Sequence, residues 1–140
     1  MSDAVRLVRS RELSDVAEYA YASVVDTPVR LVHAAGACPL DADGATVAIG
    51  DFAGQARQVM ANLRIALRDA GADLSDVLKS TVYVASTRQE DLVEAWQVVR
   101  AEFGDHDAPS TLLGVGVLGY PDQLVEVEAV AAVAIAPTRD

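Results

Sequence analysis

Lysine and cysteine are almost absent from this chain. It has one lysine, Lys79, and one cysteine, Cys38, and its 11 basic residues are outnumbered by 21 acidic ones, for a formal net charge of -10. A single thiol excludes an intrachain disulfide and fits a reducing compartment. Sequence-independent binding to nucleic acid needs clustered basic side chains, and the sequence has no such cluster. We therefore expect no nucleic-acid partner.

Long uncharged segments are also missing. Charged residues occur throughout residues 1–20, so we expect no signal peptide there. No stretch approaches the roughly 20 apolar residues of a membrane-spanning helix. These absences predict a cytoplasmic protein with no membrane partner.

The residues that usually bind metals or phosphates are too few or badly spaced. His33, His106 and Cys38 do not form a metal-binding pattern. Gly114 and Gly116 alternate in a strand-like segment, and no Lys-Ser/Thr pair follows them as in a phosphate loop. We expect no cofactor and no metal. His33 is five residues from Cys38 along an extended segment, too far to activate the thiol, so we expect Cys38 to be a small buried residue.

Apolar residues, in contrast, are abundant. They make up 51% of the 140 residues, and the mean hydropathy is +0.21 despite the charge of -10. This length suits a single domain, 1–140, with a respectable core. So much apolar content in a small acidic chain suggests that association between copies buries part of it.

Two amphipathic helices are predicted. The first begins after the N-cap Asp51 and ends at Gly71, a residue suited to a left-handed turn. The second opens with a capping-box pattern at 87–90 and closes at Gly104. Its apolar stripe consists of Leu92, Trp96, Val99 and Phe103.

The remaining segments are typical of strands. Val16–Asp26 and Val29–Ala35 flank a short turn and predict a hairpin, and residues 1–9 could add an edge strand. Further strands are expected at Val77–Ala85, Thr111–Leu118 and Leu124–Ile135. The predicted order is strand, strand, strand, helix, strand, helix, strand, strand, without a repeat or linker.

The last strand raises the question of what covers the second face of the sheet. Glu126 and Glu128 alternate with apolar residues, so both carboxylates share a face with Val130. Two helices cover only one face of a sheet, yet the predicted strands are apolar on both sides. We therefore expect another copy of the chain to cover the second face, with both glutamates in or near the subunit interface.

Three stretches together resemble the RidA/YjgF family of the Rid superfamily. They are AAGACPLDADG (34–44), QARQVMANLRIALRDAGADLSDVLKSTVYV (55–84) and APSTLLGVGVLGYPDQLVEVEAVA (108–131). The resemblance implies an α+β, chorismate-mutase-like fold with a mixed β-sheet and two helices on one face. It also implies a barrel-centred homotrimer with small-molecule ligands in clefts between subunits. The activity it implies is hydrolysis of reactive imine or enamine acids to 2-oxo acids and ammonia.

The resemblance also assigns roles to individual residues. Glu126 matches the family's conserved glutamate, which is thought to orient or activate the attacking water, a task suited to a carboxylate. Ala35 stands just before Gly36 in the turn after the predicted hairpin, at the position where many active members have a serine. Tyr21 resembles a tyrosine that often lines the cleft, and Tyr120 borders the expected site. For Glu128 the structural interpretation is favoured.

One departure from the family pattern affects substrate recognition. Active members bind the substrate carboxylate with an arginine placed just before the Ser/Thr that opens the fifth predicted strand. Here Ser110 stands at that position, followed by Thr111. Loss of a bidentate ionic contact costs on the order of 3 kcal/mol. Arg30 or Arg88 could compensate for the loss, and Trp96, which stands where some members have an asparagine, is interpreted as a packing residue.

Three functions stay open from the sequence. The leading hypothesis is an imine or enamine hydrolase that uses Glu126 and a water. The missing arginine favours a non-catalytic binding or regulatory protein on the same fold. An endoribonuclease or translation inhibitor is a third possibility, against which the charge of -10 counts.

Overall fold

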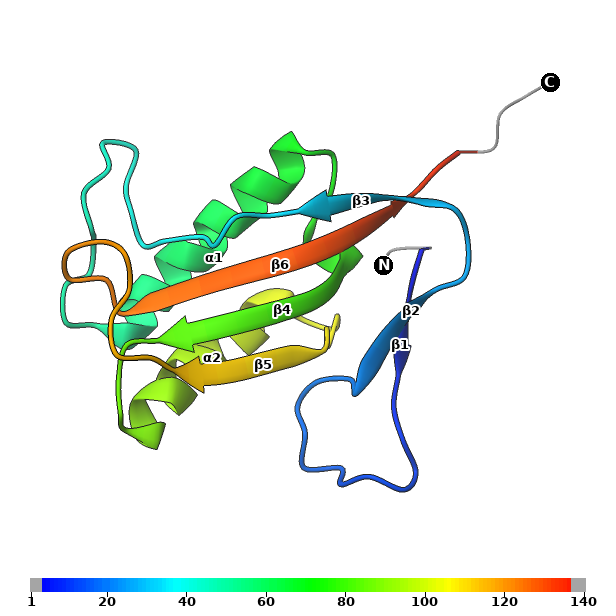
Figure 1. Ribbon diagram of the computed structural model, residues 1–140, viewed down its shortest axis with the longest axis horizontal. Coiled ribbons are helices and arrows are strands. Elements are labelled where there is room, and N and C mark those ends of the chain that lie inside the picture. The colour runs from blue at the N-terminus through cyan, green and yellow to red at the C-terminus, as the bar shows by residue number, and fades with distance from the viewer. Residues whose placement is uncertain (1–3, 137–140) are drawn as a thin grey trace.

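The computed structural model describes residues 4–136 and shows six strands, two α-helices and a short 3-10 helix in this range (Figure 1). In chain order they are β1 (Val5–Val8), β2 (Ala22–Val25), β3 (Val29–His33), α1 (Phe52–Asp69), η1 (Leu74–Asp76), β4 (Val77–Val84), α2 (Gln89–Phe103), β5 (Ser110–Gly114) and β6 (Val125–Ala134). The predicted order of elements is confirmed.

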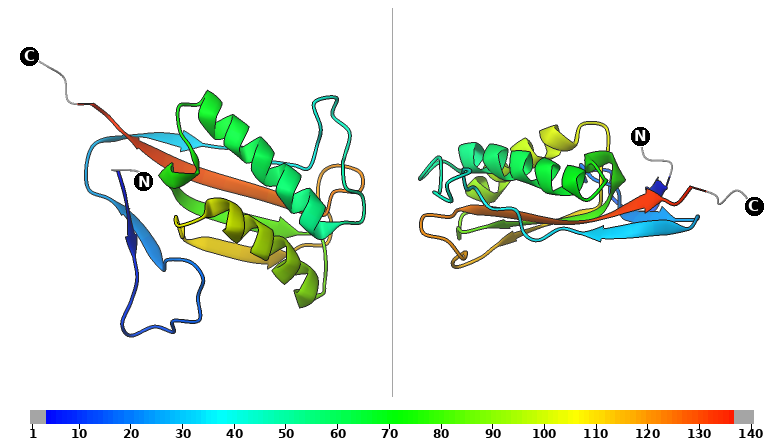
Figure 2. Two further views of the ribbon diagram at one scale, coloured as in Figure 1. Left: turned by 180° about the vertical axis from the view of Figure 1, so that it is seen from behind. Right: turned by 90° about the horizontal axis from the view of Figure 1, so that it is seen from above.

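Four strands form the main sheet in the order β3-β6-β4-β5. β6 is antiparallel to both β3 and β4, whereas β4 and β5 are parallel and joined through α2. Both α-helices lie on the same face of this sheet (Figure 2). The predicted α+β class, with a mixed sheet and two helices on one face, is therefore confirmed.

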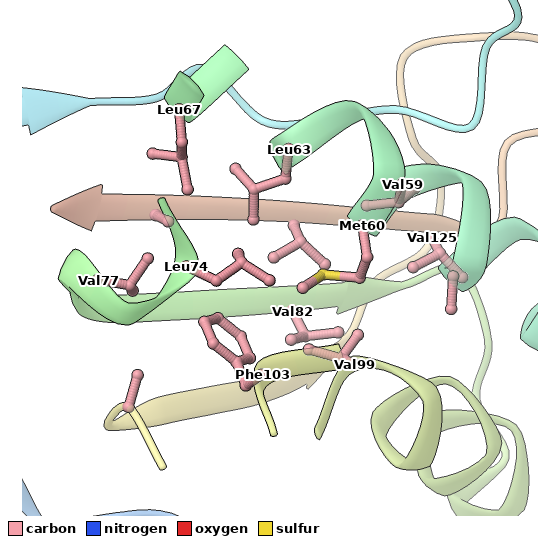
Figure 3. Close-up of a cluster of buried hydrophobic side chains, with 14 of the residues drawn as sticks. Val59, Met60, Leu63, Leu67, Leu74, Val77, Val82, Val99, Phe103 and Val125 are labelled. Carbon is pink, nitrogen blue, oxygen red and sulfur yellow. The ribbon is translucent and has the colours of Figure 1, made fainter. Parts of the chain in front are cut away.

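The core lies between this sheet and the helices (Figure 3). Alternate residues of β6 face the helices, as the period of two in a strand requires, and they are buried: Val125, Val127, Ala129 and Ala131. The apolar stripe of α1 packs against them with Val59, Met60, Leu63 and Leu67, all fully buried. Glu126 and Glu128 consequently point to the other side, called here the open face.

The two helices begin in different ways. Asp51 caps α1 as predicted: its carboxylate accepts a hydrogen bond of 2.9 Å from the Gly54 amide. The predicted capping box of α2 is wrong, because its N-cap is Arg88 and makes no side-chain capping bond. Side-chain hydrogen bonds at this end come from Ser86 instead. Its hydroxyl accepts from the Arg88 amide (3.0 Å) and donates to Asp91 (2.7 Å).

The predicted hairpin of the second and third strands is wrong. β2 pairs with β1 in a separate two-stranded sheet, and β3 pairs with β6 (Figure 1). The physical reason is the length of β6, which runs for ten residues and offers β3 an edge of unpaired backbone groups. The edge strand predicted within residues 1–9 forms as β1, beside β2 in the two-stranded sheet; residues 1–3 of that prediction lie outside the described range.

The predicted apolar second face is also wrong. A register shift between Val77 and Lys79 turns the middle of β4 by one residue, so that Ser80, Val82 and Val84 face the helices. The open face is therefore mixed. It carries Lys79, Thr81, Tyr83, Thr111, Glu126 and Glu128 beside the exposed apolar side chains of Leu31 and Leu113.

The fifth strand is shorter than predicted and ends at Gly114 rather than at 118. The Val115 amide bonds to the Val84 carbonyl (2.8 Å), and the chain then leaves the sheet. Residues 115–124 form a turn-rich connection that brings Tyr120 toward the start of β6. No helix within residues 4–136 is long and apolar enough to cross a membrane.

Candidate functional site

The Glu126 carboxylate lies where the segment after β3 runs beside β6. Ala37 and Val127 exchange two backbone hydrogen bonds, of 2.7 and 3.2 Å, in an antiparallel bridge. The next residues along this bridge, Cys38 and Glu126, stand opposite each other and share the open face. The strand pairing, rather than any sequence motif, thus places a thiol against the predicted catalytic carboxylate.

One carboxylate oxygen of Glu126 is occupied by two donors. Oε1 accepts from the Cys38 Sγ at 3.2 Å and from the Gln123 Nε2 at 3.2 Å. The Gln123 side chain is buried and fixed, because its Nε2 also donates to the Val125 carbonyl (3.1 Å) and its oxygen accepts from the Tyr120 amide (3.1 Å). The orientation of the carboxylate is therefore set by two side chains that no family motif identified.

The second oxygen, Oε2, lies beside Gly36. A Cβ atom built on Gly36 would stand 2.3 Å from Oε2, well inside van der Waals contact. None of the hydrogen bonds found among residues 4–136 reaches Oε2. Glycine at position 36 thus provides the space in which this oxygen is placed.

The Cys38 thiol is held in its neutral form. Burial raises its pKa to about 11, with further contributions from the hydrogen bond to Glu126 and from the negative charge of that carboxylate. Cys38 was predicted to be buried, but it is only half-buried and lines the cavity described below. A protonated thiol is a donor and a poor nucleophile.

A cavity of about 610 Å³ adjoins this group at the edge of the sheet. Gly36, Cys38 and Tyr120 line it together with the outer flank of α1, including Gln58 and Asn62. Asn62 fixes the wall, since its Nδ2 donates to the carbonyls of Cys38 (2.8 Å) and Leu40 (2.9 Å). The cavity is large enough for a small metabolite.

Glu128 has a different environment. Its Oε1 accepts a hydrogen bond of 2.6 Å from the Tyr83 hydroxyl, and this bond is the main reason that the pKa of Tyr83 is raised. Glu128 also lines a smaller cavity, of about 260 Å³, with His33 and Lys79 on the open face. These contacts agree with the structural interpretation of Glu128.

Ser110 lies apart from Glu126 within one chain. Its hydroxyl contacts that of Ser80 and donates to the Ala108 carbonyl (3.0 Å), on the helix side of the sheet. Ser110 is paired with Ser80, and Glu126 with Tyr83, three residues further along β4. At about 3.3 Å per residue, roughly 10 Å of strand separates the two positions, and their side chains point to opposite faces.

A third cavity, of about 250 Å³, is next to Ser110. It is lined by Ser110 and Thr111 of β5 with Tyr19 and Trp96. The rings of Tyr19 and Trp96 pack edge to face with centroids 5.9 Å apart, in agreement with the packing role predicted for Trp96. The predicted Tyr21 does not line this cavity; its hydroxyl bonds to the Ser14 carbonyl instead.

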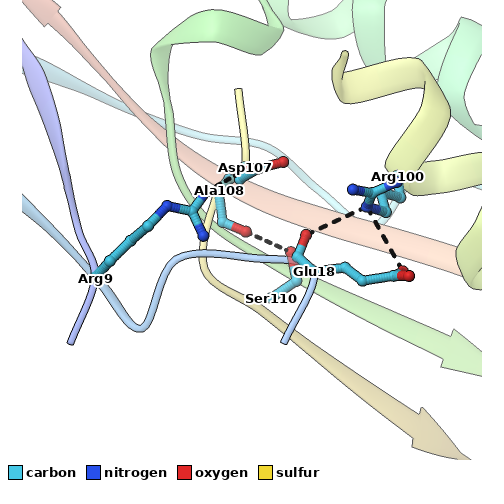
Figure 4. A network of polar contacts seen from close by, with 6 residues as sticks. All are labelled: Arg9, Glu18, Arg100, Asp107, Ala108 and Ser110. Atoms are coloured by element: carbon cyan, nitrogen blue, oxygen red, sulfur yellow. Dashed lines mark hydrogen bonds and ion pairs between the residues drawn. The ribbon is translucent and has the colours of Figure 1, made fainter. Parts of the chain in front are cut away.

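The arginines near Ser110 are already paired with acids (Figure 4). Arg9 contacts Asp107, and the Arg100 Nε lies 3.6 Å from the Glu18 carboxylate. Glu18 also accepts a bond of 3.1 Å from the Trp96 indole, so this network fastens the loop before β2 to α2.

Arg88 and Arg30, considered from the sequence as replacements, lie elsewhere. Arg88 is near Glu90 at the start of α2 (3.7 Å), and the Arg30 guanidinium lies against Gly71 beyond α1. Neither side chain lines the cavity at Gly36 and Cys38 or the one at Ser110.

The predicted site residues thus form separate groups in one chain. Gly36, Tyr120 and Glu126 come together, with the exposed Ala35 next to Gly36. Ser110 and Thr111 form another group, beside Tyr19 rather than Tyr21. Cys38, Gln123 and Tyr19 were missed as site residues, since the contacts that reveal them join distant parts of the chain. Cys38 lies within the stretch 34–44 that resembles the family, but nothing in the sequence indicates its contact with Glu126.

Comparison with known proteins connects these features to a family. The family described as endoribonuclease L-PSP matches residues 12–133. A RutC family protein of Pyrococcus abyssi is 32% identical over 100 residues, covering 71% of this chain and 76% of the relative. The 3-aminoacrylate deaminase RutC of Acinetobacter baylyi is 29% identical over 103 residues, covering 74% and 79%.

Solved structures agree with the fold. A protein of the Rid family from Yersinia pestis, YyfB, superposes with a TM-score of 0.86 at 28% identity, covering 93% of this chain and 99% of that one. A YjgF family member from Mycobacterium tuberculosis gives a TM-score of 0.61 at 30% identity, covering 93% and 100%.

Proposed function

The chain belongs to the endoribonuclease L-PSP family, also called the YjgF/RidA family, and on this premise we propose that it is a cytoplasmic homotrimer that hydrolyses small reactive imines or enamines in clefts between subunits. The observation that carries the proposal is the placement of Glu126. One of its oxygens is fixed by two donors, and the other lies beside Gly36, a residue that lines the cavity of about 610 Å³.

The division of the site into two halves supports a cleft shared between copies. Glu126 with Gly36 and Tyr120 forms one half. Ser110 belongs to the other half, roughly 10 Å away along the strands and on the opposite face, where it lines a cavity next to Thr111. A small ligand cannot contact both Glu126 and Ser110 within one chain. In a closed ring of three copies, one half from each of two neighbours would meet at each boundary.

The proposed chemistry is hydrolysis by general base catalysis. Oε2 of Glu126 takes a proton from a water whose oxygen forms a bond to the imine carbon. That proton is then delivered to the nitrogen, which gives a carbinolamine. The proton of its hydroxyl group passes by way of the same carboxylate to the nitrogen, the carbon–nitrogen bond breaks, and ammonia leaves as the carbonyl forms. An enamine enters this sequence after protonation at carbon gives the imine. Water and the imine supply every atom, and no redox partner is required.

The substrate class follows from the family relationship and from Ser110. A relative named for 3-aminoacrylate deamination acts on an enamine that carries a carboxylate. Ser110 instead offers a neutral hydroxyl already bound to Ser80 and Ala108, and the arginines nearest to it are paired with acids. We therefore propose that imines and enamines without a carboxylate are hydrolysed at least as well as imino acids.

The test is an assay with both substrate classes. Imino acids are generated in the cuvette by an amino-acid oxidase, neutral enamines are added directly, and decay is followed with and without the protein. The proposal predicts decay above the buffer rate that is proportional to protein concentration and is lost in Glu126→Gln. Decay at the buffer rate for both classes, at high protein concentration, would contradict it.

A non-catalytic binding or regulatory role is the alternative, and the absence of the arginine favours it. Ligand-dependent thermal shifts without turnover would support this role. The cavity beside Ser110, with Tyr19 and Trp96 in its wall, allows a direct comparison with Ser110→Arg. Hydrolysis of imino acids gained by that variant would indicate a working base with altered recognition, whereas no gain would favour the binding role.

RNA cleavage, named in the family's description, is the weakest candidate. The net charge of -10 opposes contact with a phosphate backbone. Cleavage that persists through purification and disappears in Glu126→Ala would support it.

A further inference from the structure

Cys38 is in direct polar contact with Glu126, and the proposed chemistry gives it no role. Its Sγ lies 3.2 Å from Oε1, and the bridge between Ala37 and Val127 fixes the two residues opposite each other. A carboxylate only accepts hydrogen bonds, so the thiol must be the donor. The contact joins residues 88 positions apart, so folding of the whole sheet is needed to form it.

The surroundings keep the thiol in its donating form. The raised pKa, about 11, means that the proton stays on sulfur throughout the neutral range. The ionisable groups on the same face are Glu126 and Glu128 of β6, Tyr83 and Lys79 of β4, and His33 of β3. Burial and the Glu126 carboxylate disfavour a negative charge at sulfur, so they maintain the neutral thiol.

From this geometry we infer that Cys38 is a positioning residue, whose thiol, together with the Gln123 amide, holds Oε1 so that Oε2 faces the space beside Gly36 as the proton-accepting atom. The inference rests on the proposed hydrolysis. It adds a role for Cys38, whose thiol contacts Oε1 of Glu126 and leaves Oε2 to accept the proton.

A thiol suits this task because it is a weak donor. An arginine or lysine at position 38 would orient the carboxylate but would also stabilise its charge strongly and weaken it as a base. A thiol restricts the orientation with a smaller effect on basicity. The neutral Gln123 amide, the second donor to Oε1, has the same property.

The kinetic test compares Cys38→Ala with Cys38→Ser. Loss of one donor should lower kcat about tenfold with KM changed less than about twofold, because the base is disordered while the cavity wall loses only one sulfur atom. Serine restores a donor and should return kcat to within about threefold of the wild type. Gly116→Ala, at an exposed glycine with open space around it, serves as the remote control and should leave both parameters unchanged.

Two kinetic outcomes would overturn the inference. One is wild-type kcat in Cys38→Ala, and the other is an equal loss in the alanine and serine variants, which would indicate packing rather than donation. Sedimentation and thermal unfolding of each variant are measured in parallel, so that a change in assembly is not mistaken for a loss of positioning.

The contact itself has a readout that needs no substrate. The infrared S–H stretch of the single cysteine should lie at lower frequency in the wild type than in Glu126→Ala, because the hydrogen bond weakens the S–H bond. If that variant does not fold, Glu126→Gln serves, with a smaller shift in the same direction because an amide oxygen is the weaker acceptor. An unchanged band in the folded variants would contradict the contact and overturn the inference.

The two measurements separate the inference from the function on which it rests. A wild type without hydrolysis but with the shifted S–H band would contradict the proposed function and the positioning role, yet support the contact. Hydrolysis that depends on Glu126 but not on Cys38 would support the function and overturn the inference alone.

Discussion

The Glu126 carboxylate packs directly against Gly36: a Cβ atom at position 36 would lie 2.3 Å from Oε2 of Glu126. The other oxygen of this carboxylate is held by Cys38 and Gln123. The glycine is therefore required by the direction of a carboxylate rather than by backbone conformation. This relationship defines the orientation of the proposed base.

Gly36→Ala should displace the Glu126 carboxylate. The added methyl group overlaps Oε2, so we expect at least a tenfold loss of hydrolysis and a loss of stability of about 1–3 kcal/mol, the usual cost of overpacking. Steady-state kinetics and denaturant unfolding measure the two effects. Gly116→Ala, whose new methyl group meets only open space, is the matched control. Equal behaviour of the two variants would contradict the fit between Gly36 and Glu126.

The two glutamates of β6 should differ in their effect on activity. Glu126→Gln removes the proposed base and should lower kcat by about a hundredfold or more. Glu128→Gln retains an oxygen that can accept from Tyr83 and should change kcat by less than about threefold. Both variants should sediment and unfold like the wild type. A reversed order of the two effects would assign the base to Glu128.

Alkylation of Cys38 should require an unusually high pH. The pKa of about 11 leaves very little thiolate near neutrality, so the rate with iodoacetamide should keep rising with pH beyond 9, the ordinary value for a thiol. In Glu126→Gln the charge and the ionic hydrogen bond are removed, and the rate profile should move to lower pH. A profile that levels off near pH 9 in the wild type would contradict the described environment of the thiol.

The same group predicts a loss of stability in alkaline solution. The folded state binds the thiol proton more tightly than the unfolded state does, because the pKa is raised from 9.0 to about 11. The contribution is therefore fully present below pH 9 and is lost as the pH rises toward 11. Cys38→Ala should show a smaller decrease in unfolding free energy across this window, measured by denaturant titration at each pH. An equal decrease in both proteins would exclude this contribution.

Local signals in the sequence were sufficient for some elements and not for others. Helix α1 was predictable because Asp51 caps it and its apolar residues repeat at helical spacing. The partner of β3 was not, since pairing with β6 is decided by which long edge is available in the folded sheet. The register shift at Val77 and Lys79 reversed the faces of β4 without any proline or glycine to indicate it.

The sequence predicted some residues of the candidate site and missed others. Glu126, Gly36 and Tyr120 followed from the family resemblance, and the structure brings them together. The role of Cys38 depends on a cross-strand contact. The sequence allowed a comparison only with the nearby His33, which contributes nothing to the thiol's environment.

The proposal of a shared cleft depends on the distance between its two halves. Glu126 and Ser110 belong to one chain but lie roughly 10 Å apart along the strands and face opposite ways. Sedimentation velocity of the wild-type protein across the micromolar range tests whether copies associate to complete the cleft. We predict a single stable species with the mass of three 14.7 kDa chains. A folded species with the mass of one chain over the whole range would contradict the account.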